Sequence, residues 1–400
     1  MTLATLAPTL DQPRSEAAHA SAAPGKEWWI EIATDRASLE KHVPAWERLA
    51  ACTVEPNVFY EPWMFLPGLD AFGEHRKLAC VLVYRRPDEL CGFFPFERLR
   101  RFKQLPVGAL ELWDHRYGFL STPLLHRDWP RETLHAFFDG VATSRLCSLL
   151  SWPKVHGDGP FHHALLEVLN ERRMLSFVDS IHTRALLRRD ASAEAYLSKI
   201  TSSGRKQWRR LRKRLAEEGR LESRALTADD DVQAWIDAFL RVEASGWKGQ
   251  DGTALASAGD RTYFETIARN AFARGQLHML GLFLDHRAIA MQCNFLSGSG
   301  AFAFKIAFDE AFAKFSPGIQ LELDNIDDLH RRTSTTWMDS CVDPGPHMID
   351  RLWLDRRVIQ SVVIATSRWV GNAVVGALPL ARACKRMWVG EGRCAGSRER

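Results

Sequence analysis

The sequence lacks the cysteine spacing of a zinc site and the leader of a secreted protein. Its eight cysteines include no CxxC pair and form no cluster with histidine, so we predict no bound metal and free thiols in a reducing cytosol. The first 25 residues have neither the cationic start nor the continuous apolar core of a secretory signal. We therefore expect a cytoplasmic protein.

Long apolar runs are also missing. No stretch reaches the roughly 18 uninterrupted apolar residues that a membrane span requires, and the nearest candidate, residues 358–383, is interrupted by Arg368, Asn372 and Pro379. This segment predicts a C-terminal helix packed on the second half of the chain, and peripheral contact with a membrane surface is the alternative. The chain does have 46% hydrophobic residues over 400 positions, enough for two or three packed domains.

Positive charge is scarce outside one segment. The net charge is +4, yet residues 199–220 contain nine Lys or Arg and two Glu, so this segment carries +7 and the remaining chain −3. A protein that coats nucleic acid spreads positive charge over a whole face, so we predict no general nucleic-acid binding. Trp208, Leu211 and Leu215 form one apolar stripe within the basic segment and Gly219 follows it, which predicts a packed helix.

The pattern of elements predicts a mixed α+β chain with two similarly ordered halves. Apolar runs at 78–86 and 89–100 predict a hairpin, and those at 277–285, 287–298 and 300–309 predict an antiparallel meander. Helical periodicity precedes and follows each group of strands, and we detect no close sequence repeat between the halves. The predicted units are a disordered tail at 1–27, an N-terminal domain at 28–188, a C-terminal domain at 189–355, and a helix and tail at 356–400.

The last strand of the predicted meander, residues 300–309, leads into a predicted helix start. Large and small side chains alternate over 300–309, which predicts a strand with its large apolar side chains on one face and Lys305 on the other. Ser316 and Pro317 then form a strong helix start. The large apolar residues of the strand are Phe302, Phe304, Ile306 and Phe308.

Four stretches of the second half resemble a known family. They are SGRKQWRRLRKRL (203–215), VEASGWKGQDGTAL (242–255), AFKIAFDEAFAKFSPG (303–318) and the Asp of WMDS (337–340). Together they resemble the GNAT acyltransferase superfamily, and more narrowly its tandem-GNAT branch, which includes the CelD-like "cellulose biosynthesis" proteins and is related to the FemAB-type aminoacyl transferases. The resemblance covers about residues 30–355. It implies two tandem GNAT-like domains, each a mostly antiparallel twisted sheet flanked by helices.

The resemblance also implies a donor site for acetyl-CoA or another acyl-CoA. Backbone amides at a helix start suit a pyrophosphate, which assigns cofactor binding to Ser316, Gly318, Ile319 and Gln320. The alternative is that Ser-Pro-Gly only caps the helix. The family's glycine-rich pyrophosphate loop is absent, and only Gly318 remains of it.

Acyl transfer to an amine needs a base and a groove for the acceptor. Asp339 and Glu243 are the catalytic candidates, with Asp309 and His347 also considered, and each has a structural role as its alternative. The candidates for substrate binding are Lys305, Gln292, Trp247, Lys248, Asp114 and His115.

We therefore expect an acyl-CoA-dependent N-acyltransferase, an acetyltransferase in the simplest case. It would act on an amine of a small molecule or of an envelope or polysaccharide precursor. Two alternatives stay open: a FemAB-type transferase that uses aminoacyl-tRNA, and a non-catalytic anion-binding module. The oligomeric state is left open.

Overall fold

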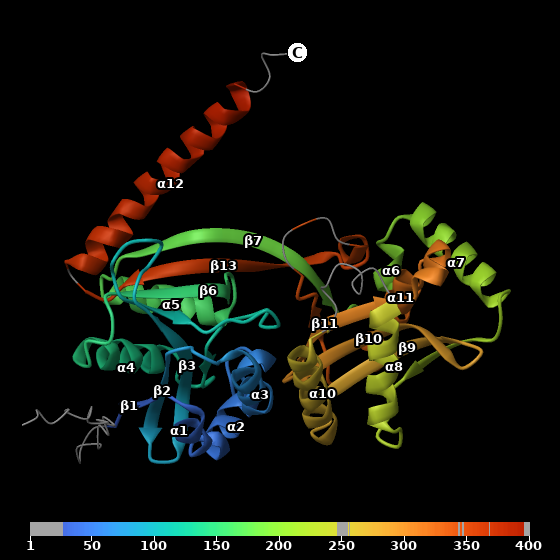
Figure 1. Ribbon diagram of the computed structural model, residues 1–400, viewed down its shortest axis with the longest axis horizontal. Helices are drawn as coiled ribbons and strands as arrows, with labels where there is room; N and C mark the ends of the chain where they lie inside the picture. The colour runs from blue at the N-terminus through green and yellow to red at the C-terminus, as the bar shows by residue number, and fades with distance from the viewer. Residues whose placement is uncertain are drawn as a thin grey trace, which may run out of the picture.

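A single large sheet runs through both halves of the protein in the computed structural model (Figure 1). The structure describes residues 27–245, 255, 257–342, 345, 348–367 and 369–395. Helices cover the sheet on both faces, and the predicted α+β class is confirmed.

The first half follows the predicted order closely. The hairpin, the two helices at 130–143 and 160–171 and the final strand are all present. Its elements are β1 (Trp29–Ala33), α1 (Arg36–Glu40), α2 (Val43–Ala51), η1 (Val58–Tyr60), α3 (Pro62–Phe72), β2 (Leu78–Arg86), β3 (Glu89–Leu99), β4 (Ala109–Leu112), β5 (Leu124–Leu125), α4 (Pro130–Thr143), β6 (Leu149–His156), α5 (Pro160–Glu171) and β7 (Ser176–Arg188).

The second half repeats this order of helices, meander, helix and strand. Its elements are α6 (Ala193–Ser198), α7 (Ser202–Ala216), β8 (Leu221–Ala225), α8 (Val232–Ser245), α10 (Ala258–Ala273), β9 (Leu277–Leu284), β10 (Arg287–Ser297), β11 (Gly300–Phe308), η2 (Glu310–Phe315), α11 (Pro317–Arg331), β12 (Trp337–Asp339), η3 (Met348–Arg351), β13 (Asp355–Ala365) and α12 (Val370–Ala395).

The strand order shows that the two halves are built alike. The main path of the sheet is β1-β2-β3-β4-β6-β13-β7-β12-β11-β10-β9-β8, so equivalent strands lie at equal distances from its centre. β4 pairs with β6 in parallel, and β11 pairs with β12 in parallel, while the other neighbours on the path are antiparallel. The tandem arrangement predicted from the order of elements is therefore confirmed.

The two halves exchange their last strands at the centre of the sheet. β13, from the end of the chain, lies between β6 and β7 of the first half, and β7 in turn pairs with β12 of the second half. Figure 1 shows β7 and β13 as long strands that run along the first half to its junction with the second. The first half therefore needs the C-terminal part of the chain to complete its sheet.

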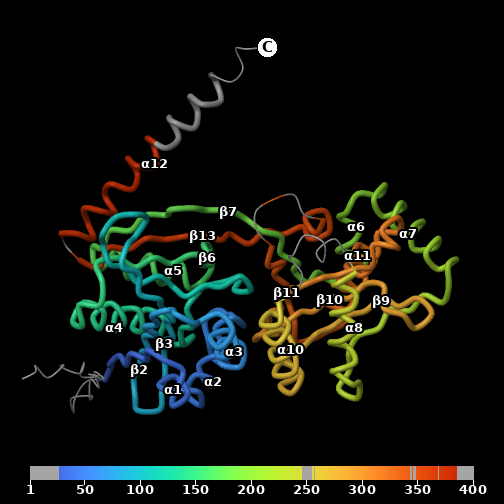
Figure 2. The backbone as a smooth tube through the Cα atoms, viewed as in Figure 1, coloured from blue at the N-terminus to red at the C-terminus, as the bar shows by residue number. Residues whose placement is uncertain are grey.

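This exchange corrects the prediction for residues 356–400. Residues 355–365 form a strand, and the C-terminal helix begins only at Val370. The stretch is rich in Val and Ile, and apolar content alone does not separate a buried strand from a buried helix. α12 contacts β13 and β7 and then points away from the two halves (Figure 2). Within the described residues, none of the helices has the length and apolar character needed to cross a bilayer.

The basic segment forms a helix, as predicted. α7 buries Trp208, Leu211 and Leu215 and leaves most of its cations exposed. The helix ends at Ala216, and Gly219 lies beyond its C-cap, where a Cβ would come within 2.4 Å of the Asp285 carboxylate. The role of Gly219 is therefore to let the β9–β10 turn approach closely. It does not adopt the left-handed conformation by which a glycine ends a helix.

A β-bulge changes which face of β11 carries Lys305. The pairing of β10 with β11 shifts register beside Phe304, so one residue of β11 is left over. Beyond this bulge the alternation reverses. Ile306 and Phe308 join the apolar cluster on the opposite face, and Lys305 lies on the face of Phe304, toward the first half. The predicted alternation along the whole strand is wrong because a bulge inserts one residue into the period of two.

Candidate active site

β11 and β12 part after a short parallel pairing. Gly300–Phe302 pair with Trp337–Asp339, and β11 then continues to Phe308 without β12 beside it. The α11 start lies against the end of β11, because a Cβ added to Gly318 would lie 3.5 Å from the Phe308 ring. β11 therefore runs past the end of β12 toward a helix N-terminus.

The first turn of α11 presents free amide groups. Pro317 has no N–H, and the Gln320 N–H donates to the Ser316 carbonyl at 3.2 Å. For the N–H groups of Gly318 and Ile319, the described part of the chain provides no hydrogen-bond acceptor. The Ser316 side chain makes no capping hydrogen bond, and the first turn contains no Asp or Glu. The helix start is therefore suited to an anion.

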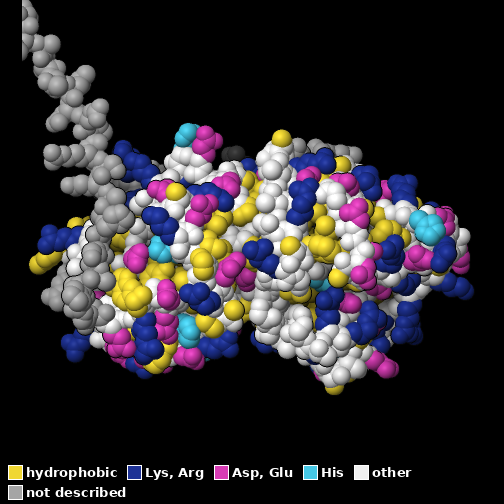
Figure 3. Space-filling model, turned by 90° about the horizontal axis from the view of Figure 1, so that it is seen from below, with side chains coloured by type: hydrophobic (Ala, Val, Ile, Leu, Met, Phe, Trp, Pro, Cys, Tyr) yellow, Lys and Arg dark blue, Asp and Glu magenta, His cyan; other side chains and the backbone are white. Residues whose placement is uncertain are grey.

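The basic helix α7 lies beside this helix start. The Gln320 side chain donates to the Trp208 carbonyl at 3.0 Å, and Arg212 pairs with Asp324 of α11 at 3.1 Å. Gln320 thus supports the site through its side chain, and its backbone amide is already engaged. Several exposed cations of α7 make no ion pair with any described acid, namely Lys206, Arg209, Arg210, Lys213 and Arg214. On the face shown in Figure 3, basic, acidic and hydrophobic side chains are interspersed, so positive charge does not form one continuous surface there.

Asp339 is part of a buried arrangement of three charges. The Asp339 carboxylate contacts the Arg184 guanidinium at 2.6 Å and the Arg357 guanidinium at 2.8 Å, and its side chain is 0% exposed. Burial alone would raise the pKa of Asp339, but the two arginines and the Cys341 N–H lower it. The three charges join β7, β12 and β13 at the centre of the sheet. This arrangement suits a structural role better than proton transfer.

Two residues predicted separately meet where the two halves pack together. Lys305 Nζ donates to Glu243 Oε1 at 2.6 Å, and the Leu255 N–H donates to Glu243 Oε2 at 3.2 Å. Both side chains of the pair are largely buried. From the first half, the Tyr117 ring lies 5.6 Å from Lys305 Nζ. This is the point at which side chains from both halves approach β11 beyond its pairing with β12.

The polar side chains of residues 114–117 are engaged in ion pairs and aromatic packing. The Asp114 carboxylate pairs with Lys154 at 2.8 Å. The His115 ring lies between Phe72 and aromatic neighbours, and burial, with nearby cations, lowers the pKa of His115 to about 3, so it is neutral at pH 7. Arg116 reaches across to Asp260 of the second half at 3.0 Å. The segment therefore fixes one half against the other.

Comparison with known proteins finds a family match within the second half of the chain. Residues 202–344 match the family described as Acetyltransferase (GNAT) domain. The second half of this protein carries a GNAT domain. The parting of β11 from β12 and the α11 start both fall inside the matched segment. No curated protein matches the sequence.

Solved structures similar to this protein extend the likeness to both halves. The crystal structure of FemX aligns with a TM-score of 0.55 at 11% identity, over 83% of this chain and 96% of that one. A conserved protein of unknown function from Bacteroides thetaiotaomicron VPI-5482 aligns with a TM-score of 0.51 at 10% identity, over 84% of this chain and 99% of that one. At such identities the likeness shows the fold alone.

Gln292 lies on the other side of the GNAT sheet from Lys305. Its side chain donates to Glu322 Oε1 of α11 at 3.0 Å, and Asn325 donates to Glu322 Oε2 at 3.1 Å. Gln292, Glu322 and Asn325 are each at most 1% exposed. Burial raises the pKa of Glu322 to about 7, although its hydrogen bonds oppose that shift. Gln292 thus holds α11 against the sheet through Glu322, on the face of the sheet opposite Lys305.

Glu322 predicts a specific pH dependence of stability. The folded protein holds the Glu322 proton up to about pH 7, whereas an unfolded carboxyl loses it near pH 4.5. The contribution of Glu322 to the free energy of unfolding is therefore fully present below pH 4.5, the pKa of the unfolded carboxyl. It is lost as the pH rises toward 7, the pKa of the folded carboxyl. We expect Glu322→Gln, which stays neutral, to gain about 2–3 kcal/mol in free energy of unfolding relative to wild type between pH 5 and pH 8. Urea unfolding at both pH values measures this, with exposed Glu217→Gln as the control; a gap between variants that does not widen with pH contradicts it.

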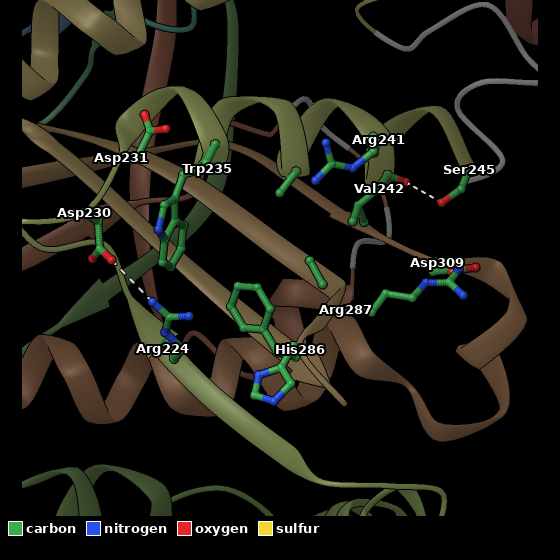
Figure 4. A pocket seen from close by; sticks show the side chains of 14 residues that line it. Arg224, Asp230, Asp231, Trp235, Arg241, Val242, Ser245, His286, Arg287 and Asp309 are labelled. Carbon is green, nitrogen blue, oxygen red and sulfur yellow. Dashed lines mark hydrogen bonds and ion pairs between the residues drawn. The ribbon is translucent and has the colours of Figure 1, made fainter.

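A cavity borders the GNAT domain's α8 on its outer side (Figure 4). It encloses about 540 Å³ between α8 and the β9–β10 turn. In Figure 4 Trp235 and Val242 project from α8 toward His286 and Arg287 of that turn. The candidate base Asp309 pairs with Arg287, and its carboxylate also caps η2. Both contacts give Asp309 a structural role beside this outer cavity.

The structure adds residues that no local pattern indicated. They are Arg184 and Arg357 around Asp339, and Asp260, which pairs with Arg116 across the two halves. Each acts through partners distant in sequence, so neither spacing nor composition singles it out. Trp247, Lys248 and His347 lie outside the described residues. The described part of the chain contains no group of His, Cys, Asp and Glu that could hold a metal ion.

Proposed function

We propose that this protein is an acyltransferase that takes an acyl group from acyl-CoA, acetyl-CoA in the simplest case, and transfers it to an amine. The observation that carries the proposal is the parting of β11 from β12 inside a GNAT domain, with the free amides of α11 at the end of β11. A thioester lying along β11 beyond β12 would place its phosphates at Gly318 and Ile319. The donor supplies an activated carbonyl, and the exposed cations of α7 would add attraction for its phosphates.

Acyl transfer moves one proton, and the junction of the two halves offers a group to receive it. The amine attacks the thioester carbonyl, the carbon–sulfur bond breaks, and the amine loses a proton as the amide forms. Glu243 is the candidate carboxylate, and its contact with Lys305 orients it. The acceptor, an amine of a small molecule or of an envelope precursor, would enter between the halves beside Tyr117.

The donor site can be tested by placing charge at the α11 start. Gly318 has ordinary backbone geometry, and a Cβ there meets nothing closer than 3.5 Å, so a Cβ can be added without a clash. We expect Gly318→Asp to weaken acetyl-CoA binding by at least about tenfold, because a carboxylate would occupy the anion position. Calorimetry measures the Kd, and Gly318→Ala is the control for added volume. Wild-type protein that neither binds acetyl-CoA nor releases CoA thiol with a panel of amines would overturn the proposal.

An aminoacyl-tRNA donor is the second candidate. The unpaired cations of α7 favour it, as does the missing glycine-rich loop. Phosphate contacts make such binding steeply salt-dependent. If tRNA is the donor, tRNA should copurify at low salt, and replacing Arg209 and Arg210 by Gln should release it and flatten the salt dependence. Absence of bound tRNA at low salt excludes this donor.

A further inference from the structure

A second cavity lies at the opposite end of β11 from the α11 start. It encloses about 340 Å³, within the range of small-molecule sites. Both halves build it. Its walls are the end of β6, the start of α5 and the end of β7 from the first half, and the β10–β11 turn, β12 and β13 from the second. Its lining includes Glu55, His156, Asp158, Arg188, Trp337 and Arg357.

The acids of this lining are already engaged. His156 lies between two carboxylates, with Nδ1 in contact with Glu55 and Nε2 at 2.8 Å from Asp158. The other Glu55 oxygen accepts the Phe161 N–H at 3.1 Å. Glu55 thereby occupies the N-terminus of α5, so that helix start is not available to a ligand.

Two arginines of the cavity lining have hydrogen-bond donors without a described partner. Arg357 is 4% exposed; its Nη1 contacts Asp339 at 2.8 Å, and its Nε has no hydrogen-bond acceptor among the described residues. Arg188 makes no ion pair with any described acid, although it lies across from Trp337 in the β7–β12 pairing. A buried guanidinium N–H without an acceptor is costly. The Arg357 Nη2 also lies 3.4 Å from His156 Nδ1, so the cavity is lined by one buried guanidinium with an unsatisfied Nε and by one arginine without a described counter-charge.

We propose that this cavity binds a small oxyanion, the carboxylate or phosphate group of a small molecule, through Arg188 and Arg357. A guanidinium fork matches either group with two parallel hydrogen bonds. The site is separate from the proposed donor site, because Ser299 at its edge precedes β11 whereas Gly318 follows it. Its ligand contacts β6, β7, β12 and β13, so binding would join the two halves where they exchange strands.

Titration with two probes tests the site. We expect inorganic phosphate or succinate to bind saturably by calorimetry and to change the intrinsic fluorescence through Trp337. Arg188→Gln should weaken the bound probe by about tenfold, since it removes a charge-assisted contact at an exposed position. Trp337→Phe should abolish the fluorescence change while calorimetric binding persists. The matched control is Arg100→Gln, an exposed cation outside the cavity, which should alter neither signal.

The outcomes separate the possibilities. Phosphate binding without succinate binding assigns a phosphate ligand, and the reverse assigns a carboxylate. No binding of either probe overturns the proposal, as does binding that Arg188→Gln leaves unchanged. Acetyl-CoA binding, measured in parallel on Arg188→Gln, should match wild type, so failure of the donor proposal and failure of this one give different results. Because Arg357 also holds Asp339, the test relies on the exposed Arg188 and avoids a variant that unfolds.

Discussion

Replacing Asp339 by Ala is expected to lower the free energy of unfolding by about 3–5 kcal/mol. The change leaves Arg184 and Arg357 buried without a counter-charge, and such broken ion pairs cost several kcal/mol. The carboxylate joins strands of both halves, so we expect one destabilised transition that involves the whole sheet. Urea unfolding followed by circular dichroism measures the change.

A surface pair provides the comparison. Glu265 bonds Arg261 at 2.8 Å on the exposed side of α10, and Glu265→Ala should cost well under about 1 kcal/mol. Replacing all three buried charges together, Asp339→Leu with Arg184→Met and Arg357→Met, should recover much of the lost stability. A change of less than about 1 kcal/mol in the single Asp339→Ala variant would show that the charges are not held as the structure places them.

Replacing Glu243 by Gln is expected to lower kcat for acyl transfer by about 10²–10⁴-fold, the usual contribution of a general base. The amide cannot take the amine proton, yet it keeps the shape of the side chain. We expect KM for the acyl donor to change little, because the α11 start lies against the end of β11, beyond Lys305. CoA thiol release measures both constants.

A second substitution at Lys305 distinguishes a catalytic role of Glu243 from a structural one. Glu243→Gln leaves Lys305 without its partner, so part of any loss could be structural. The double variant Glu243→Gln with Lys305→Met removes both charges and should regain thermal stability while kcat stays low. Activity that returns with stability in the double variant, or a kcat within threefold of wild type in Glu243→Gln, assigns Glu243 a structural role instead.

Local patterns were enough for most of the individual elements. The apolar stripe of Trp208, Leu211 and Leu215 predicted α7, and Pro317 at the first helical position predicted the start of α11, because both signals act within a few residues. The face of Lys305 was mispredicted, because the bulge beside Phe304 depends on how β10 pairs with β11. Residues 355–365 were assigned to a helix because a Val- and Ile-rich run fits two structures equally well.

The sequence by itself determined the order of elements, the tandem plan and the basic helix. Only the tertiary structure decided which charges meet. Asp339 was predicted as a base, yet it lies between Arg184, which is 155 residues away along the chain, and Arg357, which is 18 residues away. The two arginines lie on the exchanged strands β7 and β13. Glu243 and Lys305 were predicted separately, and folding joined them. Charge pairing depends on distances across the sheet, which strand exchange sets and no local spacing records.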